Sequence, residues 1–254
     1  MKIVIAGYGP VGQAMHKALE LREDISVFID DPLKGFNYEP DNFTSADGVI
    51  VCVATPMADD GSCTVDNVQS VFKKYGDDMK YLVKSTVDPE WLCEMAPQHT
   101  TFSPEFLRGS TSSDSTQEFL DSTFAIYGGG EMRFWHELFK PVLRNLTDFR
   151  FVSLEQASFA KYVENCFLAT KVVFFNEMYR LYKELGFKDF DTMVEAISLD
   201  ERIGFSHTQV PGPDGKFGYG GHCLPKDISA LRFLSDDTPL LDAVASINGR
   251  LRDG

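Results

Sequence analysis

The sequence lacks the features that direct a protein to a membrane, to nucleic acid or to an oxidising compartment. No apolar run approaches the roughly 20 residues that a membrane-spanning helix needs, and the apolar N-terminus is too short for a signal peptide. Five cysteines, an odd number without CxxC or other metal-ligand spacing, favour free thiols and no zinc or other metal site. The net charge of −14 opposes binding to DNA, RNA or anionic membrane. We therefore expect a cytoplasmic protein.

The first part of the chain alternates short apolar runs with amphipathic stretches, a pattern typical of a parallel sheet covered by helices. Strands are predicted at 2–6, 26–30, 48–54, 81–84, 100–103, 123–127 and 150–152. Helices are predicted at 10–21, 65–75, 89–95 and 131–145. The pattern predicts an α/β fold with a Rossmann-like N-terminal domain, residues 1–152, built on a mostly parallel sheet.

The pattern changes near Leu154. A segment without internal Gly or Pro, residues 154–185, predicts one helix about 45 Å long at 1.5 Å per residue. Phe159, Val163 and Phe167 indicate that this long helix is largely buried. Further helices are predicted at 190–198, 224–234 and 239–251. We expect a smaller all-helical domain over residues 153–254, opened by the long helix.

A GxGxxG motif follows the first predicted strand and begins a helix. It spans residues 7–12, and the expected cofactor contacts within it are Gly7, Gly9, Pro10, Val11 and Gly12. Its glycines permit, in order, a tight turn, a close approach of the backbone to a pyrophosphate, and close packing of helix on strand. Free N–H groups at the start of the helix suit the phosphates. Together with its position, the motif predicts a dinucleotide-binding site.

Polar residues follow several predicted strands at the edge where ligands of parallel sheets gather. The second strand ends at Asp30, near the usual distance for the acid that binds the ribose hydroxyls, whereas Asp31 before Pro32 is expected only to form a turn. With two acids and no adjacent Arg, NAD is favoured over NADP. Thr55 and Thr86 follow later strands and fit contacts to nicotinamide, ribose or water, although Ser and Thr also cap helices.

A glycine-rich loop, residues 218–227, carries Cys223 to the start of a predicted helix. A helix N-terminus and the nearby Lys226 both favour the thiolate, whereas an isolated cysteine is more often a small buried apolar residue. A thiolate can attack an aldehyde, and the thiohemiacetal can be oxidised to a thioester that water hydrolyses. An NAD site together with a nucleophilic cysteine therefore predicts the oxidation of an alcohol, in two steps, to a carboxylate.

Four further residues suit this chemistry. Lys161 and Asn165 lie four residues apart on the long helix and share a face, where they could stabilise an oxyanion or handle the alcohol proton. Glu105, at the end of a strand, is a natural base for hydrolysis, and Asp227 could orient Lys161 or the water. The alternative for Lys161 is a solvated cation on a helix surface.

These segments together resemble the UDP-glucose/GDP-mannose dehydrogenase family. The matching motifs are GYGPVG (7–12), VATP (53–56), KSTV (84–87), PEFL (104–107), AKYVENCFLATKVVFFNEM (160–178), DERIG (200–204) and GYGGHCLPKD (218–227). The resemblance implies an NAD-dependent oxidation of a nucleotide sugar, with UDP-glucose to UDP-glucuronate at C6 as the default and UDP-N-acetylhexosamines or GDP-mannose as alternatives. It also implies a homodimer built on the long central helix.

The resemblance assigns roles residue by residue. Cys223 matches the thioester nucleophile, and Glu105 matches the base for thioester hydrolysis. Thr86 matches the threonine that organises water. Lys161, Asn165 and Asp227 match the residues that handle the oxyanion and water. The implied substrate contacts are Glu105, Phe106, Leu107, Lys161, Asn165, Tyr219, Gly220 and Arg202, the last of which family dimers offer to the neighbouring subunit.

Two departures from the family pattern leave alternatives open. Gly109 stands where the pattern PEFLxEG has a second glutamate, and the sequence ends at Gly254, before the third, Rossmann-like domain that covers the nucleotide in family members. The chain could therefore be an NAD-binding or dimerising scaffold, or half of an enzyme that needs a partner. A β-hydroxyacid dehydrogenase is a second alternative, but such an enzyme performs one oxidation and needs no thiol.

Overall fold

A computed structural model describes residues 1–38, 46–107 and 114–253. Gly109, where the sequence departs from the family pattern, lies outside these ranges. The structure consists of two compact units. The first comprises Met1–Pro56 and Cys63–Lys161, and the second comprises Met57–Ser62 and Tyr162–Gly254. The sequence pattern predicts a boundary near residue 152, whereas the two units divide inside the long helix.

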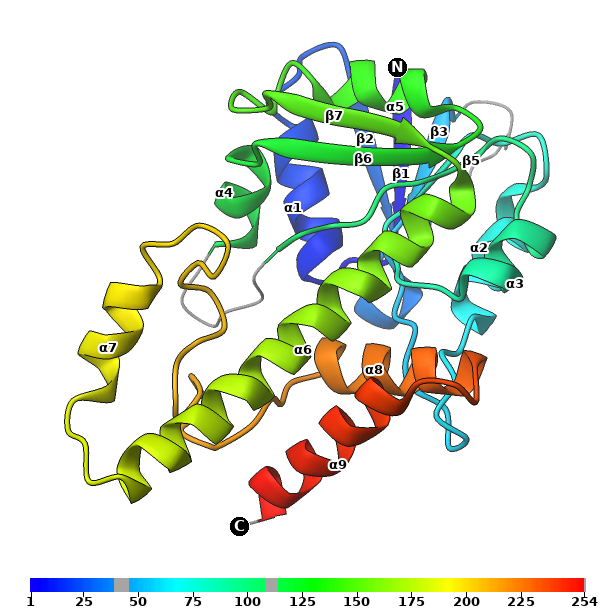
Figure 1. Cartoon of the computed structure of the whole chain (residues 1–254). Helices are drawn as coiled ribbons and strands as arrows, with labels where there is room; N and C mark the ends of the chain where they lie inside the picture. Colours follow the sequence, from blue (N-terminus) through cyan, green and yellow to red (C-terminus); the bar gives the residue numbers. More distant parts are fainter. Residues whose placement is uncertain (39–45, 108–113, 254) are drawn as a thin grey trace. The chain divides into compact units, whose positions relative to one another are not determined.

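The first unit is built on a sheet of seven strands in the order β2-β1-β3-β4-β5-β6-β7 (Figure 1). The strands are β1 Lys2–Ala6, β2 Ser26–Asp30, β3 Gly48–Val51, β4 Tyr81–Val83, β5 Thr100–Phe102, β6 Phe124–Gly129 and β7 Asp148–Val152. All neighbouring pairs are parallel except β5 and β6, which are antiparallel. The predicted α/β fold with a mostly parallel sheet is confirmed.

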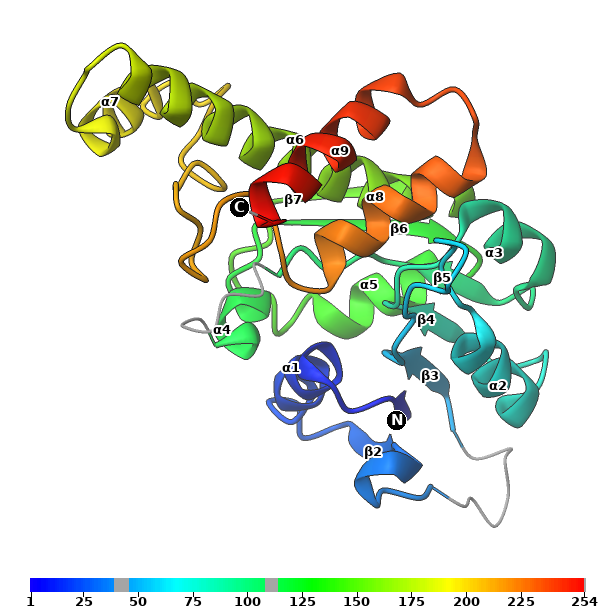
Figure 2. The same ribbon diagram turned by 90° about the horizontal axis from the view of Figure 1, so that it is seen from below.

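Helices cover both faces of this sheet, because successive side chains of a strand point to opposite faces. Ile3 and Ile5 of β1 share a buried cluster with α1 (Pro10–Leu19), α4 (Ser115–Leu120) and α5 (Met132–Phe139). Val4 and Ala6 share the opposite cluster with α2 (Asp66–Tyr75) and α3 (Pro89–Met95). Figure 2 shows α2 and α3 together on one side of the sheet and α1 on the other.

The second unit is helical, as predicted. It contains most of α6 (Leu154–Glu184), together with α7 (Phe190–Ile197), α8 (Cys223–Leu234) and α9 (Pro239–Asp253). One buried cluster joins Cys166, Ala169 and Val173 of α6 to Ile228 of α8 and Val244 of α9. A separate cluster packs the C-terminal part of α6 against α7. The N-terminal end of α8 carries the glycine-rich loop, so these clusters fix the position of that loop within the unit.

Several boundaries differ from the predictions for identifiable reasons. Helix α5 ends at Phe139 rather than at residue 145, because Pro141 lacks the N–H that would continue the helical hydrogen bonds. Strand β3 ends at Val51 rather than at residue 54. The six-residue α4 and the 3₁₀ helix η1 (Pro32–Lys34) were not predicted, because such short segments carry too little apolar periodicity.

The prediction that Phe159, Val163 and Phe167 bury the long helix is wrong, since these side chains are 49%, 50% and 61% exposed. The three positions follow one another at four-residue spacing and form a stripe along α6. Lys161 and Asn165 lie two positions further along, about 200° round the helix axis, and are buried. The apolar stripe and the polar pair therefore occupy opposite faces of α6.

The described residues carry no sign of a membrane span or a metal cluster. No helix among them combines the length and apolar character needed to cross a bilayer. Within the same ranges, no group of three or more His, Cys, Asp or Glu side chains is placed to hold a metal ion.

Candidate active site

The glycine loop between β1 and α1 has a backbone geometry that excludes side chains at two of its positions. Gly7 has a φ of +90°, and a Cβ at Gly12 would lie 2.1 Å from the carbonyl oxygen of Gly7, so neither position accepts a side chain. Gly9 begins α1 without any side-chain cap, and a Cβ built on it meets nothing within 4 Å. The N–H groups of the first helical turn are thus not capped by a side chain, and these residues fit a dinucleotide.

Asp31 lies against this loop. One of its carboxylate oxygens accepts a hydrogen bond of 2.8 Å from the backbone N–H of Tyr8. The ammonium of Lys34 donates to the carbonyl oxygen of Tyr8 at 2.6 Å. Asp31 therefore holds a carboxylate beside the glycine motif, a role that the sequence pattern did not assign to it.

Asp30 has a different environment. Its side chain is buried, its two oxygens accept hydrogen bonds from Lys74 at 2.9 and 2.8 Å, and one of them also accepts from the hydroxyl of Tyr75 at 2.6 Å. Because consecutive residues of an extended chain point in opposite directions, only one of two adjacent acids faces the glycine loop. The ribose role predicted for Asp30 remains a prediction, and the geometry favours Asp31 for it.

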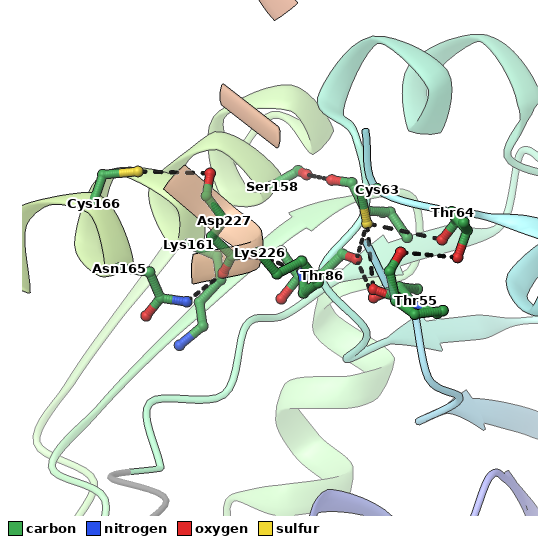
Figure 3. Close-up of polar contacts among 12 residues, drawn as sticks. Thr55, Cys63, Thr64, Thr86, Ser158, Lys161, Asn165, Cys166, Lys226 and Asp227 are labelled. Atoms are coloured by element: carbon green, nitrogen blue, oxygen red, sulfur yellow. Dashed lines mark hydrogen bonds and ion pairs between the residues drawn. The ribbon is translucent and has the colours of Figure 1, made fainter. Parts of the chain in front are cut away.

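Thr55 and Thr86 lie together in the first unit, near the carboxyl ends of β3 and β4 (Figure 3). The hydroxyl of Thr55 donates to the carbonyl oxygen of Thr86 at 2.7 Å. The thiol of Cys63 donates to the same carbonyl oxygen at 3.4 Å. These contacts fix the backbone around Thr86, whose own side chain is half-buried.

Glu105 and Lys161 meet in the first unit. The ammonium of Lys161 lies 3.6 Å from a carboxylate oxygen of Glu105 and 5.4 Å from the ring centre of Phe106. Lys161 is only 4% exposed, which excludes the alternative of a solvated surface cation. The pairing joins the start of α6 to the segment after β5, and Leu107 of that segment packs against the hydrophobic core.

Lys84, which belongs to the KSTV motif, is a second buried ammonium of this unit. It donates to the hydroxyl of Ser103 at 3.1 Å and is 5% exposed. Burial lowers the pKa of Lys84 to about 8, although the nearby Glu105 carboxylate opposes the shift. The sequence motif marked this lysine without indicating any role for it.

Cys223 is the first residue of α8, and its side chain is exposed. The preceding residue, His222, makes no side-chain cap, so the positive end of the helix dipole acts on the thiol. In the same unit Asp227 is completely buried, accepts a hydrogen bond of 2.5 Å from Asn165 and forms an ion pair with Lys226 (Figure 3). Lys226 is therefore engaged by Asp227.

Two buried asparagines hold the glycine-rich loop before Cys223. The side-chain oxygen of Asn176 on α6 accepts from the N–H of Gly218 at 3.0 Å. Asn248 on α9 accepts from the N–H of Tyr219 at 2.7 Å and donates to its carbonyl oxygen at 3.1 Å. Asn176 lies within the matching segment 160–178, which assigned it no role, and Asn248 lies outside every matching motif.

Two predicted substrate contacts border this loop. The ring of Tyr219 is buried in the core of the second unit, and desolvation raises its pKa to about 12. The backbone of Gly220 lies against the guanidinium of Arg252. Contacts from these two residues would therefore come from their backbone.

Arg202 lies on the surface of the second unit. Its guanidinium pairs with Asp200 at 2.5 Å, an interaction that raises the pKa of Arg202 and lowers that of Asp200. Lys171 of α6 anchors the adjacent loop by donating to the carbonyl oxygen of Ile203 at 2.7 Å. Arg202 also borders an apolar cavity of about 590 Å³ between α6 and α7, to which Phe167 and Phe174 contribute.

Comparisons with known proteins agree with the motifs. Residues 155–250 match the sequence profile "UDP-glucose/GDP-mannose dehydrogenase family, central domain". The UDP-glucose 6-dehydrogenase of Rickettsia typhi is 30% identical over 243 residues, which cover 88% of this chain and 54% of that protein. The chain thus spans about half the length of the curated relatives it matches.

Solved structures share the fold. A UDP-glucose dehydrogenase from Pyrobaculum islandicum superposes with a TM-score of 0.77 at 24% identity, covering 99% of this chain and 68% of the other. A Mycobacterium tuberculosis 3-hydroxyisobutyrate dehydrogenase gives a TM-score of 0.67 at 17% identity, covering 98% and 92%. At these identities the likeness concerns the fold alone.

Proposed function

Because this chain belongs, through its central domain, to the UDP-glucose/GDP-mannose dehydrogenase family, we propose that it oxidises a nucleotide sugar with NAD. The substrate we propose is UDP-glucose, oxidised at C6 to UDP-glucuronate, in line with the names of its relatives. The observation that carries the proposal is Cys223, an exposed thiol at the start of a helix and four residues before the buried Asp227.

The glycine loop and Asp31 supply the cofactor site in this proposal. The N–H groups at the start of α1 hold the pyrophosphate, and the carboxylate of Asp31 accepts from the ribose hydroxyls. An acid at this position disfavours a 2′-phosphate by charge repulsion, which favours NAD over NADP. NAD held by these residues would supply the hydride acceptor for each of the two oxidations.

The side chains of the active site handle the oxygens and protons. In the first oxidation Lys161 and Asn165 donate hydrogen bonds to the C6 oxygen, and the alcohol proton leaves through water held by Lys161. The thiolate of Cys223 then forms a C–S bond to the aldehyde carbon, giving a thiohemiacetal whose oxygen the same two residues stabilise. The second oxidation converts this adduct to a thioester.

Hydrolysis completes the sequence. Water held near Thr86 attacks the thioester carbon while Glu105 takes one of its protons, and the C–S bond breaks with its electron pair returning to the sulfur of Cys223. The balance is one alcohol, two NAD and one water giving one carboxylate, two NADH and three protons. Each cycle therefore restores the thiolate.

The fold is shared with a 3-hydroxyisobutyrate dehydrogenase, which makes a β-hydroxyacid dehydrogenase the competing enzymatic candidate. A single oxidation of a hydroxyacid stops at the carbonyl and uses no nucleophilic thiol. Cys223 in its glycine-rich loop therefore favours the two-step oxidation. A dimerising scaffold, or an enzyme half that needs a partner chain, is the remaining alternative.

A homodimer is part of the proposal. Phe159, Val163 and Phe167 form an exposed apolar stripe on α6, and Phe174 extends the apolar surface towards the cavity bordered by Arg202. A second copy packed on α6 would cover this surface and bring Arg202 to the neighbouring substrate.

Trapping the thioester tests the function directly. The chain is mixed with NAD and UDP-glucose, quenched in acid, digested and analysed by mass spectrometry. We expect a UDP-glucuronyl adduct on the peptide that contains Cys223, absent from Cys223→Ala and present in Cys93→Ala, which removes another exposed thiol. NADH formation with no adduct on Cys223 would refute the proposed route.

A further inference from the structure

Lys84 occupies a position that the proposed reaction does not yet explain. It follows β4, is buried, and donates to the hydroxyl of Ser103, two residues before Glu105. Lys84 and Glu105 border the same small cavity of the first unit, together with Phe106 and Phe119. Because the hydroxyl of Ser103 is neutral, it does not cancel the positive charge of Lys84. The electrostatic field of this charge therefore acts on other groups around the cavity.

The titratable groups that act on Lys84 are Glu105, Lys161 and Cys52. Burial raises the pKa of the Cys52 thiol to about 12, so this group is neutral at physiological pH. Lys161 is a cation and opposes the charge of Lys84. Glu105 is the carboxylate of this set, and its charge stabilises the ammonium of Lys84.

We propose that Lys84 is a positioning residue for Glu105, whose carboxylate form it stabilises across the cavity while Ser103 holds its ammonium in place. This inference rests on the proposed function. When water attacks the Cys223 thioester, an O–H bond of the water breaks and Glu105 takes the proton. The C–S bond then breaks, and its electron pair returns to sulfur. The carboxylate that takes the proton borders the same small cavity as Lys84, whose positive charge attracts it.

Lys161 alone does not suffice for this task. It lies 3.6 Å from Glu105, but the proposed chemistry directs its ammonium to the C6 oxygen of the substrate. Lys84 instead donates its hydrogen bond to the hydroxyl of Ser103, and the proposed chemistry gives it no contact with the C6 oxygen. In this proposal Lys161 therefore acts on the reacting oxygen, and Lys84 acts on the hydrolytic base, Glu105.

The first test needs no turnover. The pKa of Glu105 is measured by NMR titration of ¹³C-labelled glutamate side chains, with Glu105→Gln for assignment. We expect Lys84→Met to raise it, because a cation that attracts the carboxylate is gone, and Lys84→Arg to restore the wild-type value. Lys80→Met is the matched control, because the Lys80 ammonium lies over Phe134 instead. An unchanged Glu105 pKa in folded Lys84→Met overturns the proposal.

If Lys84→Met does not fold, the same coupling can be tested by measuring the pKa of Lys84. The pKa of Lys84, about 8 in the wild type, should fall in Glu105→Gln, because the carboxylate that stabilises its charged form is gone. A Lys84 pKa that does not change in this variant shows that the two groups are not coupled and contradicts the proposal.

The second test follows hydrolysis itself. The rate constant of thioester decay is measured in single turnovers at a series of pH values. In Lys84→Met the acid limb of this pH profile should shift to higher pH, by the same amount as the measured change in the Glu105 pKa. Lys84→Arg should return the acid limb to its wild-type position on the pH axis. A merely structural role would lower the rate at every pH without moving the limb, and that result overturns the inference. Absence of any thioester in the wild type refutes the proposed function instead, and the NMR titrations still decide the coupling.

Discussion

The side-chain amide of Asn165 donates a hydrogen bond of 2.5 Å to one carboxylate oxygen of Asp227, and Lys226 pairs with the other. The carboxylate is completely buried, so these two partners compensate its charge within the second unit. The contact also fixes the amide plane of Asn165, which leaves its second N–H available for a substrate oxygen.

Asp227→Asn tests the importance of this contact. The substitution keeps the volume but removes the charge that holds Lys226 and Asn165. We expect the free energy of unfolding to fall by about 3 kcal/mol, the lower end of the range for a broken buried pair, because Lys226 can reach water. The free energy of unfolding is measured by urea unfolding. The control is Glu195→Gln at an exposed position, which should stay within about 0.5 kcal/mol of the wild type. Equal stabilities for the two variants would show that Asp227 is not held as described.

The adjacent acids Asp30 and Asp31 should differ in what their removal changes, namely the stability of the fold for Asp30 and the affinity for NAD for Asp31. Asp31→Ala should weaken NAD binding about tenfold or more, the loss expected for hydrogen bonds to a charged group, with little change in stability. Asp30→Ala should instead lower the free energy of unfolding by about 3 kcal/mol, because Lys74 and Tyr75 lose a buried partner. Calorimetric titration and urea unfolding separate the two effects. The opposite pattern would restore Asp30 as the ribose ligand.

The buried Lys84 predicts a dependence of stability on pH. Its pKa is about 8 in the folded protein and 10.5 for the ordinary side chain, so between these values the unfolded chain binds more protons. Stability due to this group therefore rises with pH across that window, by roughly 3 kcal/mol in total. Urea unfolding of the wild type and Lys84→Met at several pH values isolates the effect, and a difference that stays constant from pH 7.5 to 10.5 would contradict it.

The exposed apolar surface of α6 should hold a dimer together. Phe174→Glu places a charge in the apolar cavity and should give a monomer, whereas Phe233→Glu, which changes an exposed phenylalanine of α8 outside that cavity, should not. Light scattering coupled to size exclusion measures the mass. A wild-type chain that is monomeric at all concentrations would end the dimer proposal.

Apolar periodicity was sufficient to predict the sheet, the long helix and the helical unit. It failed where a structure is short or where an apolar stripe faces outwards. The six residues of α4 contain too few turns for a periodic signal, and Phe159, Val163 and Phe167 have the spacing of a buried face although they are exposed. Hydrophobicity alone does not distinguish a core face from a face that another molecule would cover.

The residues of the candidate site were predicted where a motif carries a recognisable chemistry, as with Cys223 and the glycine loop. Pairings between distant segments were not predictable, because they depend on tertiary contacts. Lys74 engages Asp30 from 44 residues away, and Asn248 holds the backbone of Tyr219 from 29 residues away. Such partners changed the expected roles of Asp30 and Tyr219.

The central claim is that Cys223 makes the oxidation a two-step reaction, and the stoichiometry of NADH tests it most directly. The purified chain is mixed with excess NAD and a limiting amount of UDP-glucose, beside Cys223→Ala and Cys93→Ala as the control. We predict two NADH for each sugar consumed, with UDP-glucuronate as the product, and loss of this yield only in Cys223→Ala. One NADH for each sugar, or equal yields from Cys223→Ala and the wild type, would contradict the account.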